Sequence, residues 1–357
     1  MNKVPFHTDI SEAVALLQSL IRIPSFSKQE GETARLLESF LLSKGIQANR
    51  FLNNVWVTQQ NFNPALPTIL LNSHHDTVKP NKAYTRDPFD GAVEDGKIYG
   101  LGSNDAGGAL VSLLFTFLHF YNRTDLKYNL LFAATAEEEI SGSQGIEALL
   151  PKLPVIECGI VGEPTQMQLA VAERGLLVLD VTVEGRAGHA AREEGDNALY
   201  KAIPLIDWFK NYRFEKESAL LGPVKMSVTV IETENKAHNV VPPVCHFVVD
   251  VRVNECYTFE EVLKEINQAI PAKVLPRSLR MRSSSIAPEH PLVLAGIALE
   301  RKMYGSPTTS DKALMPFPTL KMGPGDSARS HTADEYIYEH ELEEGIRLYR
   351  ELLNSVV

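Results

Sequence analysis

Two short apolar runs, each followed directly by polar side chains, most constrain the fold of this chain. Residues 68–71 (TILL) and 130–134 (LLFAA) have the length and composition of interior strands in a parallel sheet. The first run leads into 73–78 (SHHDTV) and the second into 136–140 (AEEEI). Because ligands of open α/β sheets bind beyond the carboxyl ends of the strands, we expect both polar segments to face one cleft. Histidine and carboxylate side chains in such a cleft are typical of a metal hydrolase.

The spacing of apolar residues predicts an α/β protein with two domains. Helical and strand patterns alternate from residue 11 to about 172, which indicates a mostly parallel sheet with helices on both faces. After residue 175 the pattern changes to that of a smaller α+β domain with an antiparallel sheet. Its strands are predicted at 177–183, 225–230, 245–253 and 277–284, and its helices at about 196–213 and 258–269. We therefore expect one domain from 1–173 and 286–357, with a second domain, 174–285, inserted into it.

Composition limits the partners of the chain. Its 357 residues are 44% hydrophobic and 22% charged, and the formal net charge is −10. That charge disfavours nucleic acid or an anionic membrane surface as a partner, and the apolar runs are too short to span a bilayer. Three cysteines without a paired framework indicate thiols in a reducing compartment. Because the first apolar stretch is amphipathic rather than a signal sequence, we expect a cytoplasmic location.

His74 and Asp76 form a His-x-Asp pair directly after the first apolar run. Alternate side chains of an extended backbone lie on one side, so both can face the cleft. A histidine that binds a metal commonly donates its second ring N–H to a carboxylate. This makes His74 a candidate ligand and Asp76 its orienting partner. The alternative is a solvated polar turn in which His75 is an incidental neighbour.

Asp105 lies in a glycine-rich stretch, 100–108 (GLGSNDAGG), that leads into a predicted helix. Glycines allow positive φ angles and let a backbone approach a ligand closely. An aspartate directly before a helix is also a strong N-cap, which this motif favours when taken alone. A phosphate loop is disfavoured because no GK[ST] sequence follows. Asp105 is therefore a ligand candidate only together with the other motifs.

Glu137, Glu138 and Glu139 are the most specific signal, because three consecutive carboxylates repel one another unless cations neutralise them. A solvated loop is the alternative, but the apolar run before them and the glycine-rich turn after them argue against it.

Three weaker motifs follow: Gly162-Glu163-Pro164-Thr165 after another apolar run, Gly188-His189-Ala190 in the inserted domain, and Ser330-His331-Thr332 with Asp334-Glu335-Tyr336 near the end of the chain.

Together these motifs resemble those of the co-catalytic zinc aminoacylase/carboxypeptidase superfamily, from about residue 15 to 340. The resemblance implies a zinc-peptidase-like catalytic domain and an inserted domain that serves as a dimerisation or lid domain. It also implies two Zn²⁺ ions per chain, with Co²⁺ or Mn²⁺ as substitutes. Residue by residue, His74 and Glu163 resemble ligands of the first ion, Glu139 and His331 ligands of the second, and Asp105 the carboxylate that bridges them.

The resemblance implies further roles for residues that are not ligands. Glu138 matches the general base, and Asp76 the acid behind the first histidine. His189 resembles a histidine that reaches across the interface of a homodimer into the partner's active site. Asn239 and Arg252 match positions that bind the carboxylate of the substrate.

The function implied by the resemblance is hydrolysis of the amide bond of a small-molecule N-acyl amino acid. The acetylornithine deacetylase branch is the most similar, which implies N-acetyl-ornithine or N-succinyl-ornithine as substrate and a place in arginine biosynthesis. Succinyl-diaminopimelate, a range of acyl amino acids and dipeptides are alternatives with the same chemistry. A catalytically silent binding scaffold is the alternative from another class, and it is disfavoured because every expected position is filled.

Overall fold

The computed structural model describes residues 10–192 and 194–357, which divide into two compact units. The first unit comprises the described residues up to Val171 together with Ser285–Tyr304 and Ser310–Val357. The second comprises Ala172–Ser284 and Gly305–Thr309. Each unit has its own hydrophobic core. Residues Gly305–Thr309 belong to the second unit although the residues on both sides of them belong to the first. No local sequence pattern predicts this.

A nine-stranded sheet forms the centre of the first unit. In spatial order its strands are β1 (Asn49–Phe51), β2 (Asn54–Thr58), β6 (Asn129–Thr135), β3 (Thr68–His74), β7 (Cys158–Val161), β15 (Thr319–Lys321), β8 (Leu169–Glu173) and β13 (Ser284–Ser285), and β14 (Met303–Ser306) pairs with β8. The four central strands β6, β3, β7 and β15 are parallel. Strands β1 and β2 extend the sheet in antiparallel fashion. The predicted mostly parallel sheet is therefore confirmed.

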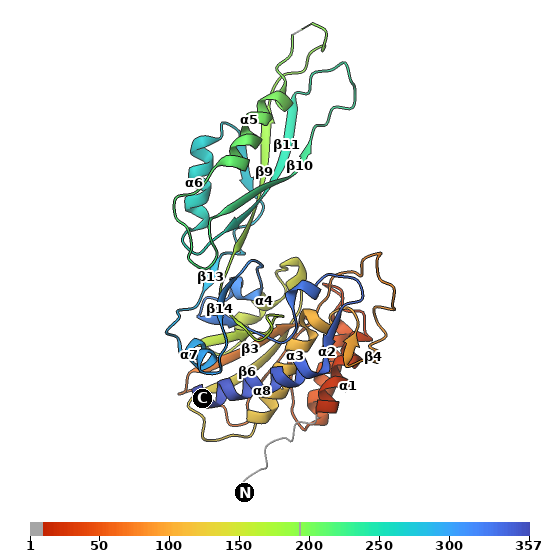
Figure 1. Ribbon diagram of the computed structural model, residues 1–357, viewed down its shortest axis with the longest axis vertical. Helices are drawn as coiled ribbons and strands as arrows, with labels where there is room; N and C mark the ends of the chain where they lie inside the picture. The colour runs from red at the N-terminus through yellow and green to blue at the C-terminus, as the bar shows by residue number, and fades with distance from the viewer. Residues whose placement is uncertain (1–9, 193) are drawn as a thin grey trace. The chain divides into compact units, whose positions relative to one another are not determined.

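Helices cover both faces of this sheet, as predicted (Figure 1). Ile69 and Leu71 of β3 belong to the core on one face, whereas Leu70 belongs to the core on the other. Burial on both faces explains why this strand is apolar throughout. The first face is covered by α1 (Ile10–Ile21), α2 (Gly31–Ser43), α3 (Gly108–Phe120), α7 (Pro291–Ala298) and α8 (Glu339–Val356), and the second by α4 (Ile146–Leu149). None of the helices in the described ranges has the length and apolarity needed to cross a membrane.

A small three-stranded sheet also belongs to the first unit. Its strands, in order, are β16 (Tyr336–Tyr338), β5 (Lys97–Tyr99) and β4 (Val93–Glu94). Because β16 pairs antiparallel with β5, it joins the end of the chain to the start of the glycine-rich stretch. No local pattern predicts this pairing, since each strand has only two or three residues.

The second unit is a four-stranded antiparallel sheet with two helices, which confirms the predicted fold class. Its strands are β10 (Lys225–Glu232), β11 (Val244–Val253), β9 (Gly175–Glu184) and β12 (Lys273–Pro276), in that order, and its helices are α5 (Ala198–Asn211) and α6 (Phe259–Ala269). The prediction of a strand at 277–284 was wrong, because the fourth strand lies just before it. Val274 faces the core, whereas Arg277 follows the strand and pairs with Asp180 of β9 at 2.8 Å.

Candidate metal centre

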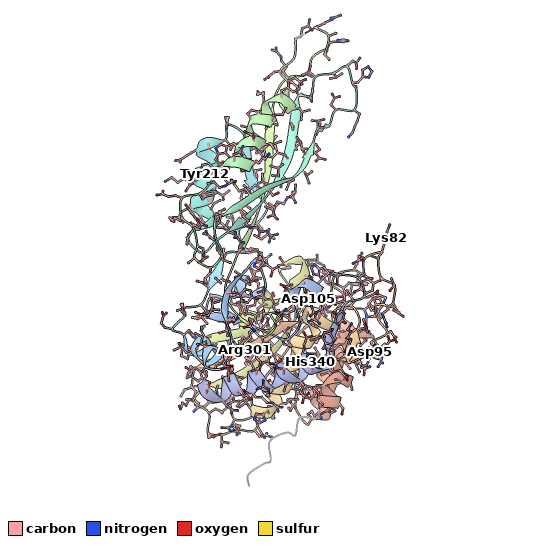
Figure 2. All side chains as sticks on the ribbon, viewed as in Figure 1. Lys82, Asp95, Asp105, Tyr212, Arg301 and His340 are labelled. Carbon is pink, nitrogen blue, oxygen red and sulfur yellow. The ribbon has the colours of Figure 1, made fainter. Side chains whose placement is uncertain are left out.

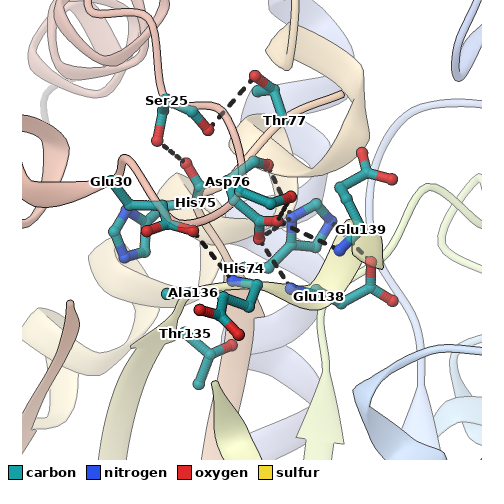
Figure 3. A network of polar contacts seen from close by, with 12 residues as sticks. Ser25, Glu30, His74, His75, Asp76, Thr77, Thr135, Ala136, Glu138 and Glu139 are labelled. Carbon is teal, nitrogen blue, oxygen red and sulfur yellow. Dashed lines mark hydrogen bonds and ion pairs between the residues drawn. The ribbon is translucent and has the colours of Figure 1, made fainter. Parts of the chain in front are cut away.

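The two polar segments singled out in the sequence lie beside each other at the carboxyl edge of the large sheet. His74 is the last residue of β3 and pairs with Thr135, the last residue of the parallel strand β6. A short turn, Glu138–Ile140, follows β6 and brings two glutamates next to His74 (Figure 3). The side chains of Glu138 and Glu139 are only 12% and 7% exposed. A solvated loop is therefore excluded for these two carboxylates.

His74 is a buried histidine whose ring reaches oxygen atoms on both sides. Its Nδ1 donates to the main-chain oxygen of Asp76 at 3.0 Å and lies 3.4 Å from the carboxylate of the same residue. Its Nε2 lies 3.4 Å from Asp105 Oδ1, 3.9 Å from Glu163 Oε1 and 4.0 Å from Glu138 Oε2. Among the described residues, this buried Nε2 has no hydrogen-bond partner. A ring nitrogen placed in this way fits a metal ligand and not a residue of a solvated turn.

Asp76 contacts His74 and also binds the turn that carries Glu138 and Glu139. Its Oδ1 accepts the N–H of Glu138 at 3.0 Å, and its Oδ2 accepts the N–H of Glu139 at 3.2 Å (Figure 3). The hydroxyl of Ser27 donates to Oδ2 at 2.7 Å. The sequence predicts only the contact with His74. The carboxylate thus fixes two of the segments that form the centre.

Asp105, which Figure 2 labels, lies close to two histidines that are far apart in the sequence. Its Oδ1 faces His74 Nε2 at 3.4 Å, and its Oδ2 faces His331 Nε2 at 3.7 Å. The same His331 nitrogen lies 3.0 Å from Glu139 Oε2. Helix α3 begins only at Gly108, so Asp105 is not its N-cap. A carboxylate with one oxygen toward each histidine is placed to bridge two metal ions.

His75 is a structural residue and not the incidental neighbour that the sequence suggests. Its Nδ1 is 2.8 Å from Thr33 Oγ1, and its Nε2 donates to the main-chain oxygen of Asn53 at 2.9 Å. Burial lowers the pKa of His75 to about 4. The imidazole is therefore neutral and joins three segments behind the centre.

The donor atoms are close enough to hold metal ions. His74, Glu138 and Glu163 form one group and His74, Asp105 and Glu139 another, each with its donor atoms within 4.8 Å of one another. A tetrahedral Zn²⁺ with bonds of about 2.0–2.1 Å separates its ligand atoms by roughly 3.3 Å, so only a small contraction is needed. Imidazole nitrogen and carboxylate oxygen are ligands that Zn²⁺, Co²⁺ and Mn²⁺ accept. The residues present therefore fit a metal centre.

The charges of the centre are poorly balanced without cations. Burial raises the pKa of Glu163 to about 8, although His74 opposes the shift. Burial likewise places the pKa of Glu138 well above its usual value. Burial disfavours the charged form of His74, but the Asp105 and Asp76 carboxylates outweigh it and hold the pKa of His74 well above the usual range. In the metal-free chain, bound protons therefore supply the neutralisation that metal ions otherwise provide.

The metal-free chain is expected to become less stable as the pH rises from about 5.5 to 8. The pKa of Glu163 is about 8 in the folded chain against 4.5 for a free glutamate, so the folded state retains a proton that the unfolded state has released. The free energy of unfolding falls with rising pH wherever the folded state binds more protons. The fall is about 1.4 kcal/mol per pH unit for each proton that only the folded state retains. Thermal unfolding of the metal-free chain at about pH 5.5 and at pH 8 measures this change as a difference in Tm. Added Zn²⁺ should raise Tm more at pH 8, and a metal-free Tm that increases between the two values would contradict the assignment.

The remaining predicted residues, His189, Asn239 and Arg252, lie in the second unit. His189 is exposed, and its Nδ1 accepts the N–H of Ala191 at 3.2 Å. The N–H of Ala190 donates to the main-chain oxygen of Asn239 at 2.9 Å, so these two predicted residues occupy neighbouring loops.

Arg252, on β11, has a partner that the sequence did not reveal. Its Nε and Nη2 donate to the two carboxylate oxygens of Asp250 at 2.8 Å and 3.1 Å. The two side chains are on one face of the strand because they are two residues apart. Any carboxylate that binds Arg252 must use the part of the guanidinium that Asp250 leaves free, or displace Asp250.

Asp311 is a further buried carboxyl group near the centre that the sequence did not indicate. Its Oδ2 accepts the hydroxyl of Thr135 at 2.8 Å and the amide of Asn72 at 3.3 Å. Burial raises the pKa of Asp311 to about 6. The contacts brace the carboxyl ends of β3 and β6. No apolar run precedes Asp311, so reasoning from strand ends does not find it.

One edge of a parallel sheet, with the loops beside it, brings two histidines and several carboxylates together, an arrangement typical of metal-dependent hydrolases. Comparison of this sequence with known protein families supports the same class of enzyme. The sequence profile of peptidase family M20/M25/M40 matches residues 70–355, and the chain belongs to this family. The chain is therefore a metallo-amidohydrolase, and its resemblance to the co-catalytic zinc superfamily is confirmed.

Relatives with assigned activities cover most of the chain. A protein named succinyl-diaminopimelate desuccinylase 2, from Ruegeria sp. (strain TM1040), is 27% identical over 289 residues, which are 75% of this chain and 72% of that protein. Succinyl-diaminopimelate desuccinylase of Blochmanniella pennsylvanica (strain BPEN) is 27% identical over 298 residues, or 77% of each chain.

Solved structures share the whole fold at low sequence identity. Aminopeptidase PepT from Bacillus cereus ATCC 10987 has a TM-score of 0.79 and 18% identity, with 98% of this chain and 99% of that chain covered. A dinuclear metal-binding peptidase of the M20 family from Bacillus subtilis has a TM-score of 0.71 and 15% identity, with 96% and 97% covered. These likenesses show the fold, including the division into a mostly parallel and an antiparallel sheet.

Proposed function

We propose that this protein hydrolyses the amide bond of an N-acyl amino acid with two divalent metal ions in the centre. The observation that carries the proposal is Asp105, which has one carboxylate oxygen toward His74 and the other toward His331. The names of the desuccinylases and of the dinuclear peptidase from Bacillus subtilis support the same chemistry. Zn²⁺ is the proposed metal, with Co²⁺ or Mn²⁺ as substitutes.

The five proposed ligands divide between the two ions. His74 and Glu163 complete the first site, and Glu139 and His331 complete the second, while Asp105 is shared. The 3.0 Å between Glu139 and His331 supports their grouping. Distances to His74 alone do not separate Glu163 from Glu138, so the resemblance decides between them. When bound, the ions polarise the substrate carbonyl and bring the pKa of a water molecule toward neutrality.

Glu138 is the proposed general base. Its carboxylate takes a proton from the attacking water and delivers it to the nitrogen of the leaving amine, which completes amide hydrolysis without a covalent enzyme intermediate. The hydrogen bond from its N–H to Asp76 Oδ1, at 3.0 Å, fixes the main chain that carries it. His189 is proposed to stabilise the negative charge that develops on the carbonyl oxygen.

The acyl group and the amino acid are the finer parts of the proposal. The resemblance to the acetylornithine deacetylase branch favours ornithine, whereas the relatives are named for succinyl-diaminopimelate. N-succinyl-ornithine combines both indications, with N-acetyl-ornithine and N-succinyl-diaminopimelate as competitors. Only the pocket around the acyl or amino acid group must differ among them.

The test is to measure kcat/KM of the zinc-loaded protein on four substrates side by side. These are N-acetyl-ornithine, N-succinyl-ornithine, N-succinyl-diaminopimelate and N-acetyl-methionine. Preference for an ornithine derivative would place the enzyme in arginine biosynthesis, and preference for succinyl-diaminopimelate would place it in lysine biosynthesis. Absence of turnover on all four, with two metal ions bound, would contradict the proposed substrate class and favour peptides or a binding scaffold.

Arg252, together with Asn239, is proposed to bind the α-carboxylate of the substrate. Replacing Arg252 by alanine is expected to raise KM, with kcat/KM falling by roughly 10- to 100-fold, because a hydrogen bond to a charged group contributes about 1.5–3 kcal/mol. Arg277→Ala is the matched control, because Arg277 also pairs with an aspartate of the second unit. Equal losses on a substrate and on its α-amide would contradict a carboxylate-binding role.

A homodimer is proposed as the active form. Tyr200 and Ile203 of α5 are 70% and 55% exposed, and β10 lies at the edge of its sheet, which supports burial of this surface against a second copy. If His189 acts in the partner's site, mixing His189→Ala chains with Glu138→Ala chains should restore activity, because each mixed dimer then holds one complete site. An inactive mixed dimer, verified by native mass spectrometry, would contradict this arrangement.

A further inference from the structure

Glu335 is a buried carboxylate that holds the main chain around Asp105. Its side chain binds three N–H groups: Oε2 accepts from Gly102 at 3.1 Å, and Oε1 accepts from Asn104 at 2.9 Å and from Asp105 at 2.8 Å. The residue is 1% exposed. These contacts hold the turn in place, because a buried N–H group that loses its acceptor costs free energy. The resemblance gives Glu335 no role.

The turn requires an external acceptor because of its own geometry. Gly102 has a φ of 77°, and Asp105 has a φ of −118° and a ψ of 94°, so the segment is not a regular helix. The first N–H groups of a helical segment have no partner within that segment. Glu335 supplies both of its oxygens to these donors. The direction of the Asp105 side chain therefore depends on a residue 230 positions further along the chain.

Glu335 also anchors the loop that carries His331. It directly precedes β16, which pairs with β5, and its main-chain oxygen accepts the N–H of Gly100 at 2.9 Å. His331 lies four residues earlier, and its side chain is 55% exposed. One residue thus joins the turn of Asp105 to the loop of His331, whose side chains approach to 3.7 Å.

We propose that Glu335 is a positioning residue that sets the spacing between Asp105 and His331 and thereby the affinity for the second metal ion. This inference rests on the proposed dinuclear centre. The two ions should depend on Glu335 to different extents. His74 ends β3 and Glu163 follows β7, and the hydrogen bonds of Glu335 given above reach neither strand. Asp105 and His331 of the second site, by contrast, lie on the two segments that Glu335 joins.

The test compares Glu335→Gln with the wild-type chain by calorimetric titration of the metal-free proteins with Co²⁺. Glutamine has the size of glutamate but directs an N–H₂ group at the main-chain N–H donors. The affinity for the second Co²⁺ is expected to fall by about 10- to 100-fold, as found for residues that support metal ligands, with a smaller effect on the first ion. The Co²⁺ absorption spectrum should change with the second equivalent only.

Two further variants separate positioning from general damage to the loop. Asp334→Asn is the matched control, because Asp334 Oδ1 accepts from the N–H groups of Thr85 and Arg86 at 2.9 Å and 3.0 Å and not from the turn of Asp105. It should bind both ions as the wild type does. Glu335→Asp keeps both oxygens on a shorter side chain and should recover part of the lost affinity. If Glu335→Gln does not fold, the comparison of Glu335→Asp with Asp334→Asn decides.

Three outcomes would overturn the inference. If Glu335→Gln binds both ions with wild-type affinity, the positioning role of Glu335 is overturned. The proposed dinuclear centre would stand, since the wild-type chain would still bind two ions. An equal loss of the second ion in Asp334→Asn would show that the loop as a whole, and not Glu335, is responsible. Binding of a single Co²⁺ by the wild-type chain would overturn the proposed dinuclear centre and this inference with it.

Discussion

Glu138→Gln is expected to lower kcat by about 10²- to 10⁴-fold, the usual contribution of a general acid–base group, while two metal ions stay bound. Glutamine preserves the shape of the side chain but does not accept a proton at neutral pH. The proposed ligands are untouched, so metal content should not change. Steady-state kinetics on the preferred substrate and elemental analysis of the dialysed protein measure the two quantities.

Glu137→Gln provides the matched control for this variant. Glu137 is the preceding residue and is also buried, but its Oε2 accepts the N–H of Gln144 at 3.2 Å and belongs to neither group of candidate ligands. It should retain most of the wild-type kcat. A Glu138→Gln protein with wild-type turnover would rule out the proposed base, and one that loses a metal ion would make Glu138 a ligand instead.

Asp105→Ala is expected to weaken the binding of both ions and to lower kcat/KM by on the order of 10³-fold or more, because metal ions contribute several kcal/mol to such reactions. The physical reason is the shared position of Asp105, whose two oxygens face different histidines. A ligand of one ion only, such as Glu163, should affect the two ions unequally when it is replaced.

Metal content and turnover of Asp105→Ala should be compared with those of Asp125→Ala. Asp125 is an exposed aspartate paired with Arg123 at 2.6 Å, so its loss should change neither quantity. Retention of two ions with wild-type affinities in Asp105→Ala would contradict the bridging role. Excess Zn²⁺ in the assay then distinguishes weakened metal binding from a loss of catalysis, since only the former is corrected by mass action.

The strand ends of the centre were predictable because they depend on local pattern. An apolar run of strand length followed by His74 or by Glu138 and Glu139 requires only the neighbouring residues and the general geometry of parallel sheets. The fold class and the family were predictable for the same reason, since each motif is a few residues long and lies in the expected order. Both predictions were confirmed. The fourth strand of the small domain was misplaced because its pattern is short and weak.

The contacts that hold the centre together were not predictable, because they join residues far apart in the chain. Asp311 braces Asn72 across 239 positions, and Glu335 binds the N–H of Asp105 across 230 positions. No local pattern marks an aspartate or glutamate for such a contact. The pairing of Arg252 with Asp250 is local, but either residue could equally have faced another partner.

The sequence by itself determined which side chains stand at the strand ends, and therefore the class of chemistry, because side-chain type and strand period are local properties. Only the tertiary structure decided how these side chains are oriented, which carboxyl groups are buried and which N–H groups they bind. Orientation and burial depend on segments that approach one another only after folding. For that reason the contact of Asp76 with the glutamate turn and the supporting contacts of Asp311 and Glu335 are seen only in the folded chain.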